Sequence, residues 1–129
     1  MFTFMKFFRN NILSILFSAL IAVSSFTSSK SISKINFLHL QNIDKVVHLL
    51  MYACLTFLIL FENRNRIKNK IHYVLIISIT FAYGLIIEIL QPIITNSRSR
   101  EPADMMFNLS GIIAVVIIWY VINNYKKKL

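Results

Sequence analysis

The 129-residue chain contains little glycine, proline, cysteine and acid. Two glycines and two prolines are too few for the many tight turns of an all-β protein. The only cysteine, Cys54, cannot form an intrachain disulfide, which excludes a disulfide-stabilised secreted scaffold. Charged residues make up 15% of the chain and hydrophobic residues 57%, whereas a soluble domain has about 25% charged residues. Together these features indicate a multi-pass membrane protein.

The net charge of +9 reflects 14 basic residues against five acidic ones. A nucleic-acid-binding protein would gather its Lys and Arg on one soluble face. Here they lie in short hydrophilic pieces between apolar runs, where basic residues fix the orientation of an inserted chain. We therefore expect the lipid bilayer as a partner and no nucleic acid.

Four apolar segments are long enough to cross a membrane as helices. Two of the four reach this length only when their polar ends are included. A span takes ~20 residues, because each helical residue rises about 1.5 Å and the hydrocarbon is about 30 Å thick. The segments cover about residues 11–26, 44–61, 71–94 and 105–122. We predict an all-α integral membrane bundle of four transmembrane helices, forming a single domain over residues 1–129.

The first segment has two interpretations. Lys6 and Arg9 precede its apolar core, and Ala22-Val23-Ser24 resembles the cleavage site of a signal peptide. Nothing after residue 30 resembles a secreted domain, so we favour an uncleaved signal anchor.

The distribution of basic residues predicts the orientation of the bundle. With the N-terminus inside, the N-terminal arm, the 62–70 loop and the C-terminal tail carry nine Lys and Arg, and the opposite side carries five. Because positive residues favour the cytoplasmic side, we predict that both termini are cytoplasmic.

Three of the five acids lie within or at the ends of spans, although an ionisable group in lipid costs at least ~2.5 kcal/mol. Each belongs to a stripe with helical spacing on one face of its span. The stripes are Asp44, His48 and Tyr52; Gly84, Glu88 and Gln91; and Asp104, Asn108 and Gly111.

Because successive spans alternate in direction, all three stripes are expected near the outer leaflet. Gly84 and Gly111 would let helices approach closely. A polar network that only fixes the bundle is one interpretation. A functional site is the other, and we favour it for the whole set.

These residues resemble the motifs of the VanZ-like family of bacterial membrane proteins, over about residues 12–118. The motifs are Asp44-Lys45-x2-His48-x3-Tyr52, then Glu88-x2-Gln91, then Arg98-x5-Asp104-x3-Asn108-x2-Gly111. The chain departs from the family in having Thr95-Asn96-Ser97 where a glycine often precedes the loop arginine, and Arg100 is an alternative counterpart to Arg98.

The resemblance implies a multi-pass protein of the bacterial cytoplasmic membrane with a role in the cell envelope. The family's namesake is linked to low-level resistance to the glycopeptide teicoplanin, but the family's biochemical activity is not established. The candidates for the functional site are Asp44, Lys45, His48, Tyr52, Glu88, Gln91, Arg98, Asp104 and Asn108, with Gly84 and Gly111 in helix packing.

The leading hypothesis is an outward polar pocket that engages an envelope component, such as a lipid-linked precursor or a glycopeptide. Arg98 or Arg100 would then meet a phosphate or carboxylate, which suits the planar guanidinium. One alternative is an intramembrane enzyme that uses acid/base or metal-assisted chemistry on a lipid-linked precursor. Another is a structural bundle that oligomerises or supports a larger complex. The chain has no HExxH or nucleophile motif, so we expect no metal and no cofactor and favour a non-enzyme.

Overall fold

The computed structural model describes residues 8–27, 43–95 and 102–126, and the regular structure in these ranges is helical. Its elements are α2 (Ile12–Phe26), α4 (Ile43–Glu62), α5 (Lys70–Thr95) and α6 (Pro102–Lys126). No strand occurs within these ranges, so the all-α prediction is confirmed. The four helices lie over the four predicted segments. Helix α6 begins earlier than expected, at Pro102, since proline is well tolerated in the first turn of a helix.

Three of these helices are long and apolar enough to cross a membrane: α4 with 20 residues, α5 with 26 and α6 with 24 from Pro102 to Tyr125. Many of their large apolar side chains face outward; Ile79 is 65% exposed and Met106 is 70% exposed. Such exposed surface suits lipid rather than water. Helix α2 has 15 residues and rises only ~22 Å. The chain is therefore a membrane protein, and the crossing of the first segment stays a prediction.

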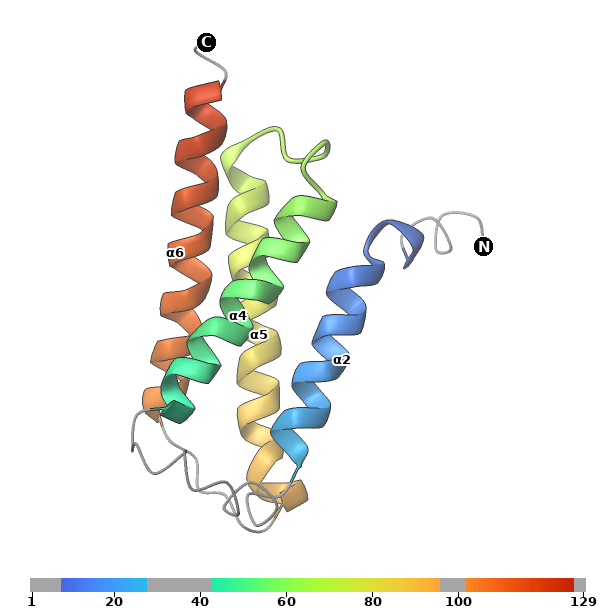
Figure 1. Ribbon diagram of the computed structural model, residues 1–129, viewed down its shortest axis with the longest axis vertical. Helices are drawn as coiled ribbons and strands as arrows, with labels where there is room; N and C mark the ends of the chain where they lie inside the picture. The colour runs from blue at the N-terminus through green and yellow to red at the C-terminus, as the bar shows by residue number, and fades with distance from the viewer. Residues whose placement is uncertain (1–7, 28–42, 96–101, 127–129) are drawn as a thin grey trace.

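The helices pack as an antiparallel bundle (Figure 1). In this view α2 and α5 run downward, whereas α4 and α6 run upward. The last turns of α2 and α5 therefore share one end of the bundle with the first turns of α4 and α6. We call this the Asp44 end and the opposite one, where α4 finishes, the Glu62 end.

The apolar core lies between these two ends. Ile21, Tyr52, Leu55 and Ile112 form a cluster to which α2, α4 and α6 all contribute. A second cluster joins α4, α5 and α6 through Leu60, Ile76 and Val116.

Gly111 brings the backbones of α6 and α4 into direct contact. A Cβ at this position would lie 2.3 Å from the carbonyl oxygen of Leu49, which is well inside van der Waals distance. On α5, a Cβ at Gly84 would lie 2.9 Å from Cε1 of the Tyr52 side chain. Small residues of this kind allow helices in membranes to approach closely. Gly111 thus lets α6 pack closely against the backbone of α4, whereas Gly84 on α5 makes room for the ring of Tyr52.

Helix α2 is bound to the bundle by side chains of other helices. At the Glu62 end, the carboxylate of Glu62 accepts hydrogen bonds from the backbone N–H of Leu13 at 2.8 Å and of Ser14 at 3.1 Å. The hydroxyl of Ser14 donates a third, at 2.5 Å. The cap residue Asn11 makes no side-chain capping bond of its own. Glu62 therefore satisfies backbone donors that the start of a helix leaves without partners.

Helix α5 holds the rest of α2. The hydroxyl of Tyr83 donates to the carbonyl of Ser18 at 2.5 Å, and Nε2 of Gln91 donates to the carbonyl of Ser25 at 2.9 Å. Since Ser25 lies in the last turn of α2, Gln91 satisfies a carbonyl that the helix itself cannot.

Candidate functional site

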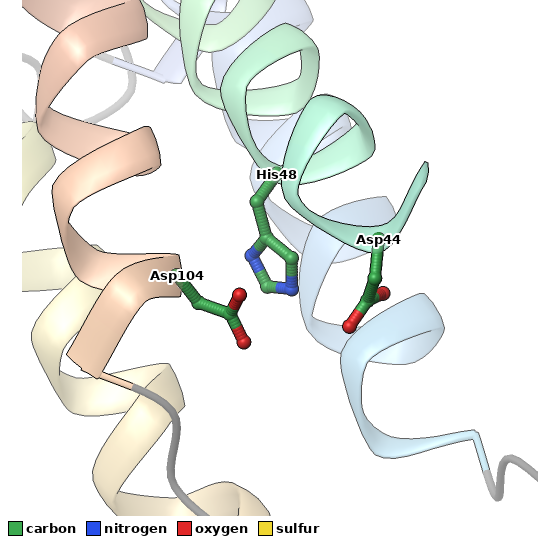
Figure 2. A group of neighbouring side chains, drawn as sticks. All are labelled: Asp44, His48 and Asp104. Carbon is green, nitrogen blue, oxygen red and sulfur yellow. The ribbon is translucent and has the colours of Figure 1, made fainter. Parts of the chain in front are cut away.

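At the Asp44 end, α4 and α6 bring two carboxylates and an imidazole together. Asp44, His48 and Asp104 each offer one oxygen or nitrogen atom, and these atoms all lie within 4.8 Å of one another. Figure 2 shows the imidazole between the two carboxylates, with Asp104 facing it from the neighbouring helix. His48 and Asp104 are buried, whereas Asp44 is exposed. The group therefore extends from the interior of the bundle to its surface.

Helix α5 adds a third carboxylate on the inner side of the imidazole. Oε1 of Glu88 lies 3.6 Å from Nδ1 of His48, and both side chains are almost completely buried. This distance is longer than a direct hydrogen bond, but it places a negative group beside one ring nitrogen.

Asn108 lies one turn after Asp104 on the same face of α6 and is only 1% exposed. Within the described part of the chain, neither Oδ1 nor Nδ2 of this amide has a hydrogen-bond partner. A buried polar group left in this way costs about 1–3 kcal/mol. The polar stripe of α6 therefore has hydrogen-bonding capacity to offer to a bound group.

The local sequence explains why these side chains meet. Asp44 and His48 are four residues apart, as are Asp104 and Asn108, so each pair shares one face of its helix. Gly111 extends the same face of α6 and contacts the backbone of Leu49, directly after His48. The close approach at Gly111 thus sets the separation between the faces that carry His48 and Asp104. We call Asp44, His48, Glu88, Asp104 and Asn108 the acid–histidine cluster.

A family model described as VanZ/LLP1 matches residues 1–123. The chain belongs to the VanZ/LLP1 family. The match includes all three helices that carry the acid–histidine cluster and confirms the resemblance seen in the sequence. No curated protein and no solved structure matches the chain.

The other predicted site residues of this VanZ/LLP1 protein lie in different surroundings. Tyr52 is 1% exposed and belongs to the apolar core. The amide of Gln91 holds the end of α2. Lys45 is half-buried next to Asp44 on α4. Arg98 and Arg100 lie outside the described residues.

Glu62 was not singled out in the sequence, although its carboxylate accepts three hydrogen bonds from the start of α2. Its position at the end of an apolar run is typical of an interfacial charge. Only the packing of α2 against the end of α4 makes it a cap. One signal could have identified Glu62. It is an acid at the boundary of one span, and another apolar helix has no capping bond of its own for its first N–H groups.

A pocket of about 520 Å³ lies among α2, α4 and α5, and it does not include the acid–histidine cluster. Its lining is mainly apolar, with polar side chains toward the Glu62 end that include Asn11, Asn63 and Arg66. This pocket could not be predicted from the sequence, because its width depends on the distance between α2 and α5. The acid–histidine cluster and this pocket thus lie in separate parts of the bundle.

Proposed function

We propose that the acid–histidine cluster is a binding site on the extracytoplasmic side of the bacterial cytoplasmic membrane, and that it engages a cell-envelope component. The observation that carries the proposal is the convergence of ionisable side chains from three helices at one end of an otherwise apolar bundle.

The energetics favour a site over a purely structural network. An ionisable group inside a membrane costs at least ~2.5 kcal/mol, whereas an interhelical polar contact contributes on average about 0.6 kcal/mol. Close packing at Gly111 and the core around Ile112 already hold α4 and α6 together. If the bundle bound no ligand, apolar residues at these positions would therefore make it more stable.

Charge supports the orientation. The connection between α4 and α5 carries Arg64, Arg66 and Lys68 at the Glu62 end, all of them exposed. Because positive loops favour the cytoplasm, this end would be cytoplasmic, and the cluster would face the outside. In this orientation all four helices cross the membrane and both termini are cytoplasmic.

The proposed ligand carries a phosphate or a carboxylate, as a lipid-linked envelope precursor or a glycopeptide does. Arg98 or Arg100, in the segment that connects α5 with α6, would contact this anion, and Asn108 would add a neutral hydrogen bond. A contribution to resistance against teicoplanin-type glycopeptides would follow from binding of this kind.

The test measures binding of a fluorescent lipid-linked precursor to the purified full chain in nanodiscs. We expect the double variant Arg98→Ala/Arg100→Ala to bind at least tenfold more weakly than wild type. The matched control is Arg64→Ala/Arg66→Ala, which removes the same charge at the Glu62 end and should bind normally. Wild-type affinity in the first variant, or no binding by wild type, would contradict the proposal.

A further inference from the structure

We infer that Asp44, His48 and Asp104 bind a divalent metal ion. This inference departs from the sequence-based expectation of no metal, because the three ligands come from two helices and form no compact motif. It rests on the proposed function in that it names a component of the same site. Binding of the metal itself requires no envelope component.

The donor set and its spacing suit a small divalent cation. Imidazole nitrogen together with carboxylate oxygen is a donor set for ions such as Mn²⁺ and Zn²⁺. Zinc ligands lie about 2.0–2.2 Å from the ion in a tetrahedral arrangement, so two donor atoms on one ion would be ~3.4 Å apart. The observed separations, all within 4.8 Å, reach this geometry when the donor atoms of a pair move toward each other by at most ~1.4 Å in total.

Charge also favours a cation here. Asp44 and Asp104 bring two carboxylates within this distance of one another, and like charges so close repel strongly at a partly buried position. A divalent ion converts that repulsion into attraction, since it becomes the largest local charge.

Glu88 has the position of an outer carboxylate that orients the histidine ligand. Metal-binding histidines almost always donate their other ring N–H to a carboxylate, a carbonyl or water. Oε1 of Glu88 lies 3.6 Å from Nδ1 of His48, which leaves Nε2 for the metal. Glu88 is therefore a positioning residue in this site rather than a ligand.

Asn108 supplies the independent sign that a group binds here. Its amide is 1% exposed, on the same face of α6 as Asp104, and has no hydrogen-bond partner among the described residues. Three protein ligands leave a zinc-type ion with an open position for water or a substrate oxygen. Asn108 could hydrogen-bond such an oxygen, and the exposed Asp44 gives access from the surface. The same open position would accept the anionic oxygen of the proposed envelope component.

The experiment uses the purified full chain, stripped with EDTA and titrated separately with Mn²⁺ and Zn²⁺. Electron paramagnetic resonance would follow free Mn²⁺, and elemental analysis after desalting would count Zn²⁺. We expect one ion per chain for at least one of the two metals. Affinity should fall more than tenfold in His48→Gln, in Asp104→Asn and in Asp44→Asn. Glu88→Gln should bind about tenfold more weakly.

The matched control is His72→Gln, which removes a histidine of α5 at the Glu62 end and should bind metal as wild type does. Asp44→Asn changes an exposed side chain, so it tests the site even where a buried substitution prevents folding. Absence of a stoichiometric ion in wild type, or wild-type affinity in folded Asp44→Asn and His48→Gln, would overturn the inference.

The two proposals fail separately. No stoichiometric ion in the Mn²⁺ and Zn²⁺ titrations, with precursor binding that is unchanged in EDTA, would overturn the metal site and leave the proposed function in place. Stoichiometric metal without any precursor binding would do the reverse.

Discussion

Glu62 and Glu88 show how differently one residue type is used in this chain. Glu62 is half-buried and accepts three hydrogen bonds from the start of α2. Glu88 is 4% exposed and faces the imidazole of His48. The first carboxylate stabilises a helix terminus, where negative charge is favourable. The second lies in a group of ionisable residues that we assign to binding.

Replacing Glu62 should destabilise the protein. Glu62→Ala removes the acceptor for the N–H groups of Leu13 and Ser14, and loss of a helix cap costs about 0.5–2 kcal/mol. Thermal unfolding in mild detergent would measure the change. Glu62→Gln keeps one carbonyl acceptor and should lose less. Equal stability of Glu62→Ala and wild type would show that α2 does not depend on this cap.

Neutralising Glu88 should have the opposite outcome. Residues kept for function commonly lower the stability of the folded state. We therefore expect metal-free Glu88→Gln to unfold at the same temperature as metal-free wild type, or at a higher one. The same detergent melting experiment measures it. A drop of about 3–5 kcal/mol, typical for breaking a buried ion pair, would instead favour a structural network.

At the scale of elements, the contact between α4 and α6 determines whether the cluster forms at all. Gly111→Ala would place a methyl group against the backbone of Leu49, and neither helix can yield without moving the other. Overpacking of this kind costs about 1–3 kcal/mol. We expect lower thermal stability and weaker metal binding together. Ser110→Ala is the control, because Ser110 is exposed and bonds only its own helix; it should change stability by less than about 0.5 kcal/mol.

Helix α2 depends on α5 for its last turn. Gln91→Leu would remove the donor to the buried Ser25 carbonyl, which costs about 1–3 kcal/mol. Because Gln91 serves α2, we expect the melting temperature to fall while the metal affinity of the folded protein stays unchanged. Ile93→Leu, two residues further along α5 at a position 65% exposed, should affect neither quantity. Loss of metal binding in folded Gln91→Leu would return this residue to the site.

For the whole molecule, the bundle makes a topological prediction. Thr27, after α2, and Asn69, before α5, are both exposed and belong to opposite ends. In a Cys54→Ser background, Thr27→Cys should react with a membrane-impermeant maleimide in intact cells. Asn69→Cys should react only after the membrane is opened, because its positively charged end is expected in the cytoplasm. The reverse pattern would place the acid–histidine cluster on the cytoplasmic side.

The amino-acid sequence by itself determined the helices, their polar stripes and the end of the bundle that these stripes share. Apolar runs and helical spacing are local properties, and alternating direction brings Asp44, Glu88 and Asp104 to one end whatever the packing. The motifs also sufficed to identify the family.

The tertiary structure decided which polar groups meet. Spacing gives the height and face of a residue on its own helix, but not the helix that packs against that face. Gln91 therefore shares a stripe with Glu88 and yet bonds Ser25 of α2. Asp104 approaches Asp44 and His48 because Gly111 lets α6 and α4 come into backbone contact. The candidate metal site exists only through that contact, since its ligands lie on two helices far apart in the chain.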